Sequence, residues 1–87
     1  MPIISTFFGI IIKIHYQDHN PPHFHAEYQG QQAIFAIKNA KILEGDFPKK
    51  LIPVLKEWTL EHKKELLEDW ERAQKNEPLF KISGADS

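Results

Sequence analysis

Hydrophobic side chains follow two different spacings in the two halves of this 87-residue chain. In the second half they recur at intervals of three or four residues, which is the spacing of one face of an α-helix. The members of this face are Leu51, Leu55, Trp58, His62, Leu66, Trp70 and Ala73. In the first half the apolar residues are β-branched and aromatic and come in short runs, which favours strands. A β half followed by a helical half predicts an α+β fold.

The first half is expected to form a small antiparallel meander of three to four strands. The predicted strands are residues 7–16 (FFGIIIKIHY), 23–29 (HFHAEYQ), 32–38 (QAIFAIK) and the short pair Ile42 and Leu43. The first strand belongs to an apolar stretch that begins near residue 1, and its middle is apolar enough to be covered on both faces. Turns are expected around Gly30 and residues 39–41, where polar residues interrupt the apolar runs.

The second half is expected to pack across one face of this sheet as a long or kinked helical segment. Proline is tolerated in the first helical turn but not in the interior, so regular helix begins near Lys50 or kinks at Pro53. Periodicity does not distinguish one long helix from two helices with a bend near His62. The expected core combines the isoleucines of the first strand with residues Phe24, Phe35, Leu55, Trp58 and Trp70.

The C-terminal residues offer one further element. After the helical segment ends before Pro78, residues 78–83 (PLFKIS) are candidates for an edge strand. The chain is expected to form one domain over residues 1–83, and residues 84–87 (GADS) are expected to be a flexible tail.

Composition excludes several classes of function. The chain has no cysteine, which excludes disulfides and thiolate chemistry and agrees with a cytoplasmic location. Residues 1–43 carry a net charge of +1 and residues 44–87 a net charge of −2, so neither half has the basic surface of a DNA-binding protein. A local RNA contact stays open. The apolar N-terminal run is shorter than the roughly 20 residues of a membrane span, so no membrane association is expected.

Histidine is concentrated in one stretch. Three of the five histidines lie within residues 18–25 (DHNPPHFH). Side chains alternate along a strand, so His23 and His25 should share an exposed face about 7 Å apart, with Phe24 on the core side. Two imidazoles at this spacing can hold a divalent metal such as zinc. Glu27, His15 and Asp18 are the further candidate ligands; the strand register decides whether His15 or Tyr16 joins them.

Other interpretations of the same stretch stay open. His19, His23 and His25 are candidates for general acid–base catalysis, because histidine titrates near neutral pH. Alternatively, the histidines form only a polar strand face, and the double proline only stiffens a turn.

Several blocks of the chain resemble a family of short bacterial and archaeal proteins catalogued as a domain of unknown function. The resemblance rests on ISTFFGIIIKI, DHNPPHFHAEYQG, ILEGDFPKKLIPVLKEW, HKKELLEDWERAQ and PLFKI, and it covers about residues 2–82. Its most specific element is a D-H-x-P-P-H-F-H signature, which maps onto Asp18, His19, Pro21, Pro22, His23, Phe24 and His25. His15 and Pro53 depart from the family pattern, which weakens His15 as a shared site residue.

The resemblance implies no established activity, but it does imply a partner. Members look like companions of a second small protein encoded beside them, in a toxin–antitoxin-like arrangement. The leading hypothesis is therefore a small cytoplasmic protein that works with such a neighbour or as a homo-oligomer, with a histidine-rich surface at residues 18–27. The alternatives are a metal-binding or histidine-dependent hydrolase, such as an RNase, and a pure protein-interaction module.

Overall fold

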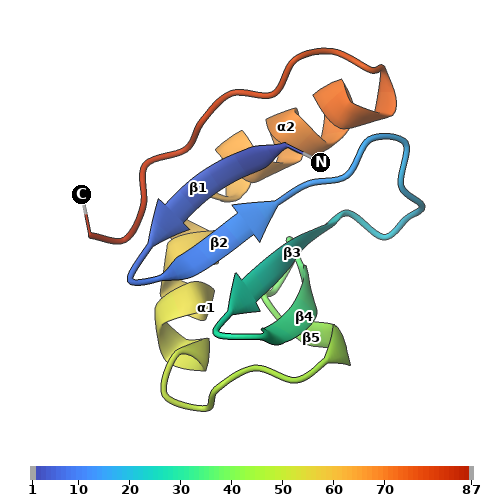
Figure 1. Ribbon diagram of the computed structural model, residues 1–87. Coiled ribbons are helices and arrows are strands. Elements are labelled where there is room, and N and C mark those ends of the chain that lie inside the picture. Colours follow the sequence, from blue (N-terminus) through green and yellow to red (C-terminus); the bar gives the residue numbers. More distant parts are fainter. Residues whose placement is uncertain (1, 87) are drawn as a thin grey trace.

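The computed structural model describes residues 2–86 and has five strands followed by two helices (Figure 1). The strands are β1 (Ile3–Phe7), β2 (Ile10–Lys13), β3 (His23–Tyr28), β4 (Gln31–Ala36) and β5 (Ile42–Gly45). The helices are α1 (Ile52–Glu61) and α2 (Lys63–Gln74). All strands are antiparallel to their neighbours, in the order β1-β2-β3-β4-β5. The predicted α+β meander is confirmed, with one more strand than expected.

The extra strand comes from a tight turn inside the apolar N-terminal run. Phe8 and Gly9 have φ angles of 52° and 79°, and Phe7 pairs with Ile10 across the turn. Two successive residues with positive φ form the two-residue hairpin turn whose twist matches the flanking strands. The prediction of one strand over residues 7–16 is therefore wrong. Apolar composition continues through the turn, so it hid the reversal of the chain.

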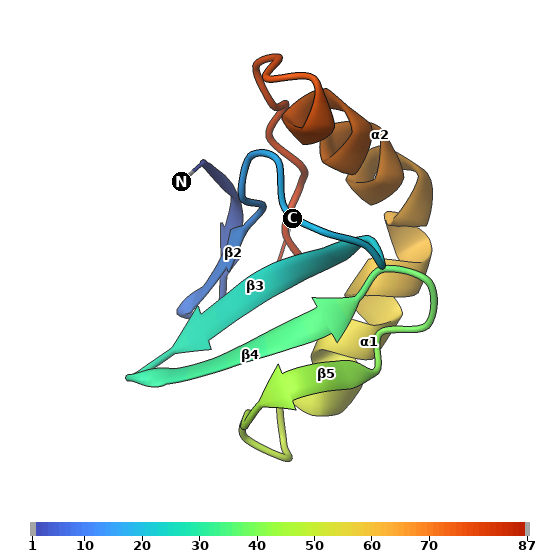
Figure 2. The same cartoon turned by 90° about the vertical axis from the view of Figure 1, so that its right-hand side faces the viewer.

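Only one face of the sheet is covered. Ile10, Ile12 and Ile14 are fully buried, whereas the alternating Ile11 and Lys13 are only partly buried. Figure 2 shows both helices on the same side of the sheet, so the other side has no covering layer among the described residues. The expectation that the first strand is covered on both faces is wrong. Ile11 lies on the uncovered face, where cross-strand neighbours shield part of its surface.

The helical segment is two helices with a break at His62. This residue has φ −109° and ψ 21°, outside helical geometry, and it ends α1 and precedes α2. Pro53 lies in the first turn of α1, where it costs no hydrogen bond. Neither helix combines the length and the apolar composition needed to cross a membrane, within the described part of the chain.

Aromatic rings connect the helices to the covered face. Phe24 and Phe35 pair across β3 and β4 with ring centroids 5.5 Å apart. The indole of Trp58 meets the Phe24 ring edge-on at 5.8 Å and also packs against Phe7 at 5.0 Å. Trp70, from α2, is also buried. The predicted core is confirmed in its main members.

The C-terminal residues cross the helices and return to β1 without forming a strand. The backbone N–H of Ile82 donates to the carbonyl of Ile4 at 2.8 Å, and the indole N–H of Trp58 donates to the carbonyl of Ser83 at 2.8 Å. The N–H of Phe80 donates to the buried carboxylate of Asp69 at 2.9 Å. These contacts anchor the segment at separate points, so the edge strand predicted over residues 78–83 is absent. The division into a domain of residues 1–83 and a tail of residues 84–87 stays a prediction.

Phe24→Ala should destabilise the protein by about 3–5 kcal/mol, because it removes a fully buried ring from the centre of the aromatic core. Urea denaturation followed by tryptophan fluorescence measures this loss. Phe80→Ala is the matched control, since Phe80 is 61% exposed. An equal loss for the two variants would contradict the placement of the core.

Candidate functional site

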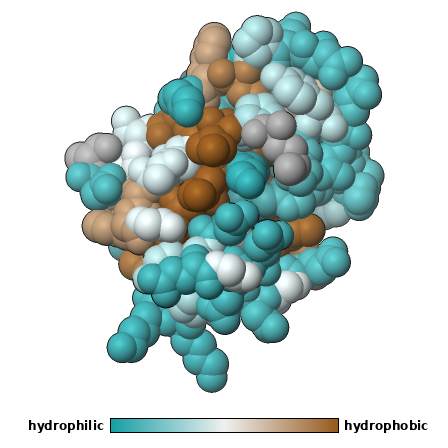
Figure 3. All heavy atoms as spheres, in the orientation of Figure 1, coloured by the Kyte–Doolittle hydropathy of each residue, from teal (hydrophilic) through white to brown (hydrophobic). Residues whose placement is uncertain are grey.

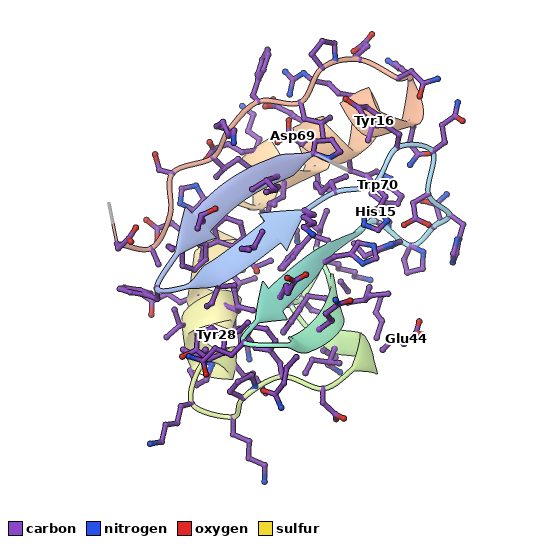
Figure 4. The ribbon with its side chains drawn as sticks, in the orientation of Figure 1. His15, Tyr16, Tyr28, Glu44, Asp69 and Trp70 are labelled. Carbon is purple, nitrogen blue, oxygen red and sulfur yellow. The ribbon has the colours of Figure 1, made fainter. Side chains whose placement is uncertain are left out.

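A cluster of polar side chains lies on the uncovered face of the sheet, where β2 and β3 meet the loop of residues 14–22. His25 is in β3, opposite Lys13 of β2 and Ile34 of β4. His15 lies two residues after Lys13, at the start of the loop, and its ring stacks on that of His25 with centroids 3.7 Å apart and planes 5° apart. Figure 4 shows His15 at this end of β2. The register therefore brings His15, and not the exposed Tyr16, to the histidines of β3.

Asp18 connects the loop to both histidines of β3. Its Oδ2 lies 2.9 Å from Nε2 of His23 and 3.5 Å from Nε2 of His25. Its Oδ1 accepts a hydrogen bond from the backbone N–H of His19 at 2.9 Å. The loop is also tied to α2, because the N–H of Gln17 donates to the carbonyl of Ala73 at 3.1 Å. Backbone contacts thus hold the carboxylate over the sheet.

His23 is buried, which corrects its predicted place on an exposed face. Its relative exposure is 4%, and its ring packs against the indole of Trp70 at 5.0 Å. Nδ1 lies 2.8 Å from the carbonyl oxygen of Pro21, and Nε2 faces Asp18. Both partners are acceptors, so both contacts are hydrogen bonds only when the ring carries two protons. A neutral ring donates through one nitrogen and keeps a lone pair on the other. His23 connects the loop to Asp18, and it is not a member of the group of ligand atoms that converge.

Two further candidates lie at the margin of the cluster. The side chain of His19 is 91% exposed, with its Nδ1 3.1 Å from Oδ1 of Asp18 and its ring centroid 6.0 Å from that of His23. Glu27 forms an ion pair with Lys13 at 3.6 Å and accepts a hydrogen bond from Gln32 at 3.4 Å. The predicted catalytic set stays a prediction. So does the full set of candidate metal ligands, which are His23, His25, Glu27, His15 and Asp18.

The residues that do converge are His15, Asp18 and His25. Each offers one ligand atom, and these atoms all lie within 4.8 Å of one another. It is the only group of three or more potential ligands of this kind within residues 2–86. All three residues are candidates from the sequence, but the H-x-H spacing favours His23 over His15. The signal that selects His15 is the strand register, which the sequence leaves open.

Burial and hydrogen bonding set the charges of the cluster. Burial alone raises the pKa of Asp18, but hydrogen bonds from the His19 backbone and the rings of His23 and His25 outweigh it and lower this pKa to about 2. Burial lowers the pKa of His15 and of His25, and the proximity of the two rings lowers that of His15 further. At neutral pH the cluster thus presents one carboxylate and two neutral imidazoles.

The cluster opens into a hollow of about 460 Å³. Ile34, Leu43 and Glu44 form its far side. Glu44 lies opposite Ile34 in the register of β4 and β5 and is labelled in Figure 4. Sequence reasoning missed Glu44, because β5 lies far from the histidine stretch along the chain. Figure 3 views the uncovered face and shows hydrophobic side chains gathered in its middle and mainly hydrophilic ones on its right-hand and lower parts.

Comparison with known families shows which family carries this cluster. Residues 9–71 match the family model described as Domain of unknown function (DUF4160), and the match spans more than half of the chain. The chain belongs to the DUF4160 family. No curated protein and no solved structure matches it. The DUF4160 match includes His15, Asp18, His25 and Glu44, so both sides of the hollow lie within the family domain.

His23→Ala should destabilise the DUF4160 domain by about 1–3 kcal/mol, because it leaves the Asp18 carboxylate and the Pro21 carbonyl without their ring partner. Thermal denaturation measures the change. His19→Ala is the matched control in the same loop, and we expect it to leave the melting temperature unchanged. Equal melting temperatures for wild type and His23→Ala would show that His23 has no structural role.

The lowered pKa values of His15 and His25 predict an acid-sensitive fold. The unfolded chain binds protons on these rings near pH 6.5, whereas the folded chain binds them only at lower pH, so protonation favours unfolding. In the presence of EDTA, the melting temperature should fall as the pH drops from about 7 to about 5. The His15→Gln/His25→Gln variant should show a smaller fall. An identical slope in both proteins would contradict this assignment.

Proposed function

We propose that the protein binds a divalent transition metal, with zinc the best fit, through His15, Asp18 and His25. The observation that carries the proposal is the convergence of three ligand atoms within 4.8 Å on the uncovered face. Two imidazoles and one carboxylate are a donor set that zinc accepts, and three protein ligands leave a fourth tetrahedral position open. The neutral histidines and ionised carboxylate are in the protonation states that coordination requires.

The distance between Asp18 and His25 suits a shared metal better than a direct hydrogen bond. Ligand atoms about 2.0–2.1 Å from a tetrahedral zinc lie about 3.3–3.4 Å from each other. The separation of 3.5 Å between Oδ2 of Asp18 and Nε2 of His25 is close to that value, and it is long for a hydrogen bond. The 2.9 Å contact with His23 Nε2 would hold the carboxylate from the other side, as partners of metal ligands commonly do.

Coordination requires one adjustment of the cluster. The lone pair of an imidazole nitrogen lies in the plane of the ring, and the planes of His15 and His25 are 5° from parallel. Two parallel rings direct their lone pairs side by side instead of toward one point. Metal binding therefore requires the rings to tilt apart. His15 can make this movement, because it lies in the loop beyond the end of β2.

Hydrolysis is the reaction that such a site suits. Zinc lowers the pKa of a bound water to about 7, which supplies a nucleophile at neutral pH. The hollow beside the cluster has room for a small substrate group, and Glu44 on its far side is a carboxylate able to accept a proton. This supports the hydrolase alternative, an RNase included. A reaction by His19, His23 and His25 alone is less favoured, because the nitrogens of His23 already have partners.

The implied partner protein stays part of the proposal. A neighbour-encoded companion in a toxin–antitoxin-like module, or a second copy in a homo-oligomer, would have the uncovered sheet face available for contact. A cytoplasmic location belongs to the same proposal. A pure interaction module is the alternative in which the histidine cluster only shapes the loop of residues 14–22.

Zinc should bind with micromolar or tighter affinity in titration calorimetry at pH 7.5, and affinity should fall below about pH 6 as the imidazoles take up protons. His15→Ala, Asp18→Asn and His25→Ala should each weaken binding at least about tenfold. His19→Ala is the matched control and should bind as wild type does. A wild-type signal no larger than that of the His15→Ala/His25→Ala variant would rule out the site.

Zinc-loaded protein should hydrolyse bis(p-nitrophenyl) phosphate, and EDTA should abolish the reaction. Glu44→Gln should lower kcat by about a hundredfold or more, the range of general-base catalysis, with zinc affinity unchanged. Hydrolysis that survives EDTA but is lost in His25→Ala would favour the metal-independent alternative. Zinc binding without hydrolysis would leave a metal site and remove the proposed reaction.

A further inference from the structure

The strand β5 is an open edge of the sheet. It pairs with β4 on one side, and no other strand within residues 2–86 pairs with its other side. All four of its residues are exposed. The opposite edge, β1, is partly occupied, because the C-terminal segment donates a hydrogen bond from Ile82 to Ile4. An unpaired row of backbone N–H and C=O groups can accept a further strand from another chain.

A groove with three lysines lies beside this edge on the helix side of the sheet. It encloses about 590 Å³ between the β4–β5 turn and α1. Lys38 and Lys41 come from the turn and Lys56 from α1. Ile52 and Leu60 also line it, and they lie four residues before and after Lys56 on the same helix face. The groove therefore combines an apolar lining with positive charge.

The three ammonium groups have no acidic partner in this structure. Every ion pair of the described residues involves other side chains, and the one lysine among them is Lys13. Lys38, Lys41 and Lys56 are all exposed. Three uncompensated charges around an apolar groove attract an anionic ligand with some apolar surface.

The edge strand separates this groove from the hollow at the histidine cluster. Ile42 lines the lysine groove, whereas its neighbours Leu43 and Glu44 line the hollow. The pairing of β5 with β4 shifts register here, since Ile34 pairs with Glu44 and Phe35 with Ile42, so Leu43 is an extra residue in β5. A strand added to β5 would lie between the groove and the hollow.

We propose that the β5 edge binds an extended, acidic segment of a partner protein by strand addition, with its carboxylates against Lys38, Lys41 and Lys56. This inference does not depend on metal binding. Lysines at an edge commonly prevent unwanted pairing. Here they would repel basic strands and admit acidic ones, so charge would select the partner.

Two other occupants fit less well. If two copies paired symmetrically through β5, their sheets would join into one, with all the helices on the same face. The two lysine grooves would then lie close together, and their like charges would repel. A nucleic acid would use the lysines but not the backbone groups of an open strand edge.

The test uses three fluorescein-labelled ten-residue peptides and fluorescence anisotropy, with the full chain in EDTA. One peptide alternates Glu and Val, the second alternates Lys and Val, and the third is the Glu peptide with alternate backbone nitrogens methylated. We expect the Glu peptide to bind at least about tenfold more tightly than either control, because only it has both the charges and the strand-pairing groups.

Substitutions locate the contact. Lys41→Glu/Lys56→Glu should weaken Glu-peptide binding at least about tenfold, since both charges are reversed. Lys63→Glu/Lys64→Glu makes the same change of charge on α2, outside the groove, and should alter affinity less than about twofold. If the first variant fails to fold by circular dichroism, Lys41→Gln/Lys56→Gln replaces it and should weaken binding in the same direction.

Four results would overturn the proposal. In the first, the Glu peptide does not bind at all. In the second and third, the Lys peptide or the methylated Glu peptide binds as tightly as the Glu peptide. In the fourth, Lys41→Glu/Lys56→Glu and Lys63→Glu/Lys64→Glu change the affinity for the Glu peptide equally. Single-stranded RNA that binds in its place and is lost in Lys41→Glu/Lys56→Glu would assign the groove to nucleic acid. A dimer seen by light scattering and abolished by that variant would assign the edge to a second copy.

Discussion

Burial of a single sheet face by two helices is the constraint on which the rest of the structure depends. Trp58 packs against Phe7 and Phe24, and Trp70 is buried above the start of β3 against His23. A short domain buries only about two-thirds of the surface that its unfolded chain exposes. The apolar side chains of this chain therefore cover one face of the sheet and leave the other uncovered. The other face is therefore free to carry polar residues, and the histidine cluster lies there.

The cluster and the core share one residue. His23 belongs by strand alternation to the face of His25, yet it is buried because the loop folds over it and Trp70 packs against its ring. Its hydrogen bonds to Pro21 and Asp18 connect the stability of the fold to the position of the carboxylate. The core thus positions this cluster, although its three candidate ligands are only partly buried.

Sequence patterns predicted the presence of strands and helices better than the residues at which they begin and end. Local periods of side chains correctly predicted the core side of β3 at Phe24 and most of the helical face. The buried members of that face are Leu55, Trp58, Leu66, Trp70 and Ala73. The hairpin at Phe8 and Gly9 was missed, since its turn lies within continuous apolar composition. The strand over residues 78–83 was wrong, since an apolar segment can also be anchored by isolated contacts such as Trp58 to Ser83.

The candidate site shows the same division between local and long-range information. Local composition was enough to locate a histidine-rich surface and to include His15, Asp18 and His25 among its members, because residue type and strand alternation are local properties. The tertiary structure brings these three together without His23 and Glu27, because of the strand register and a loop that packs against α2. It also places Glu44 beside them, because β5 pairs with β4. Contacts between residues distant in the chain follow from the packing of the whole domain, which no local pattern encodes.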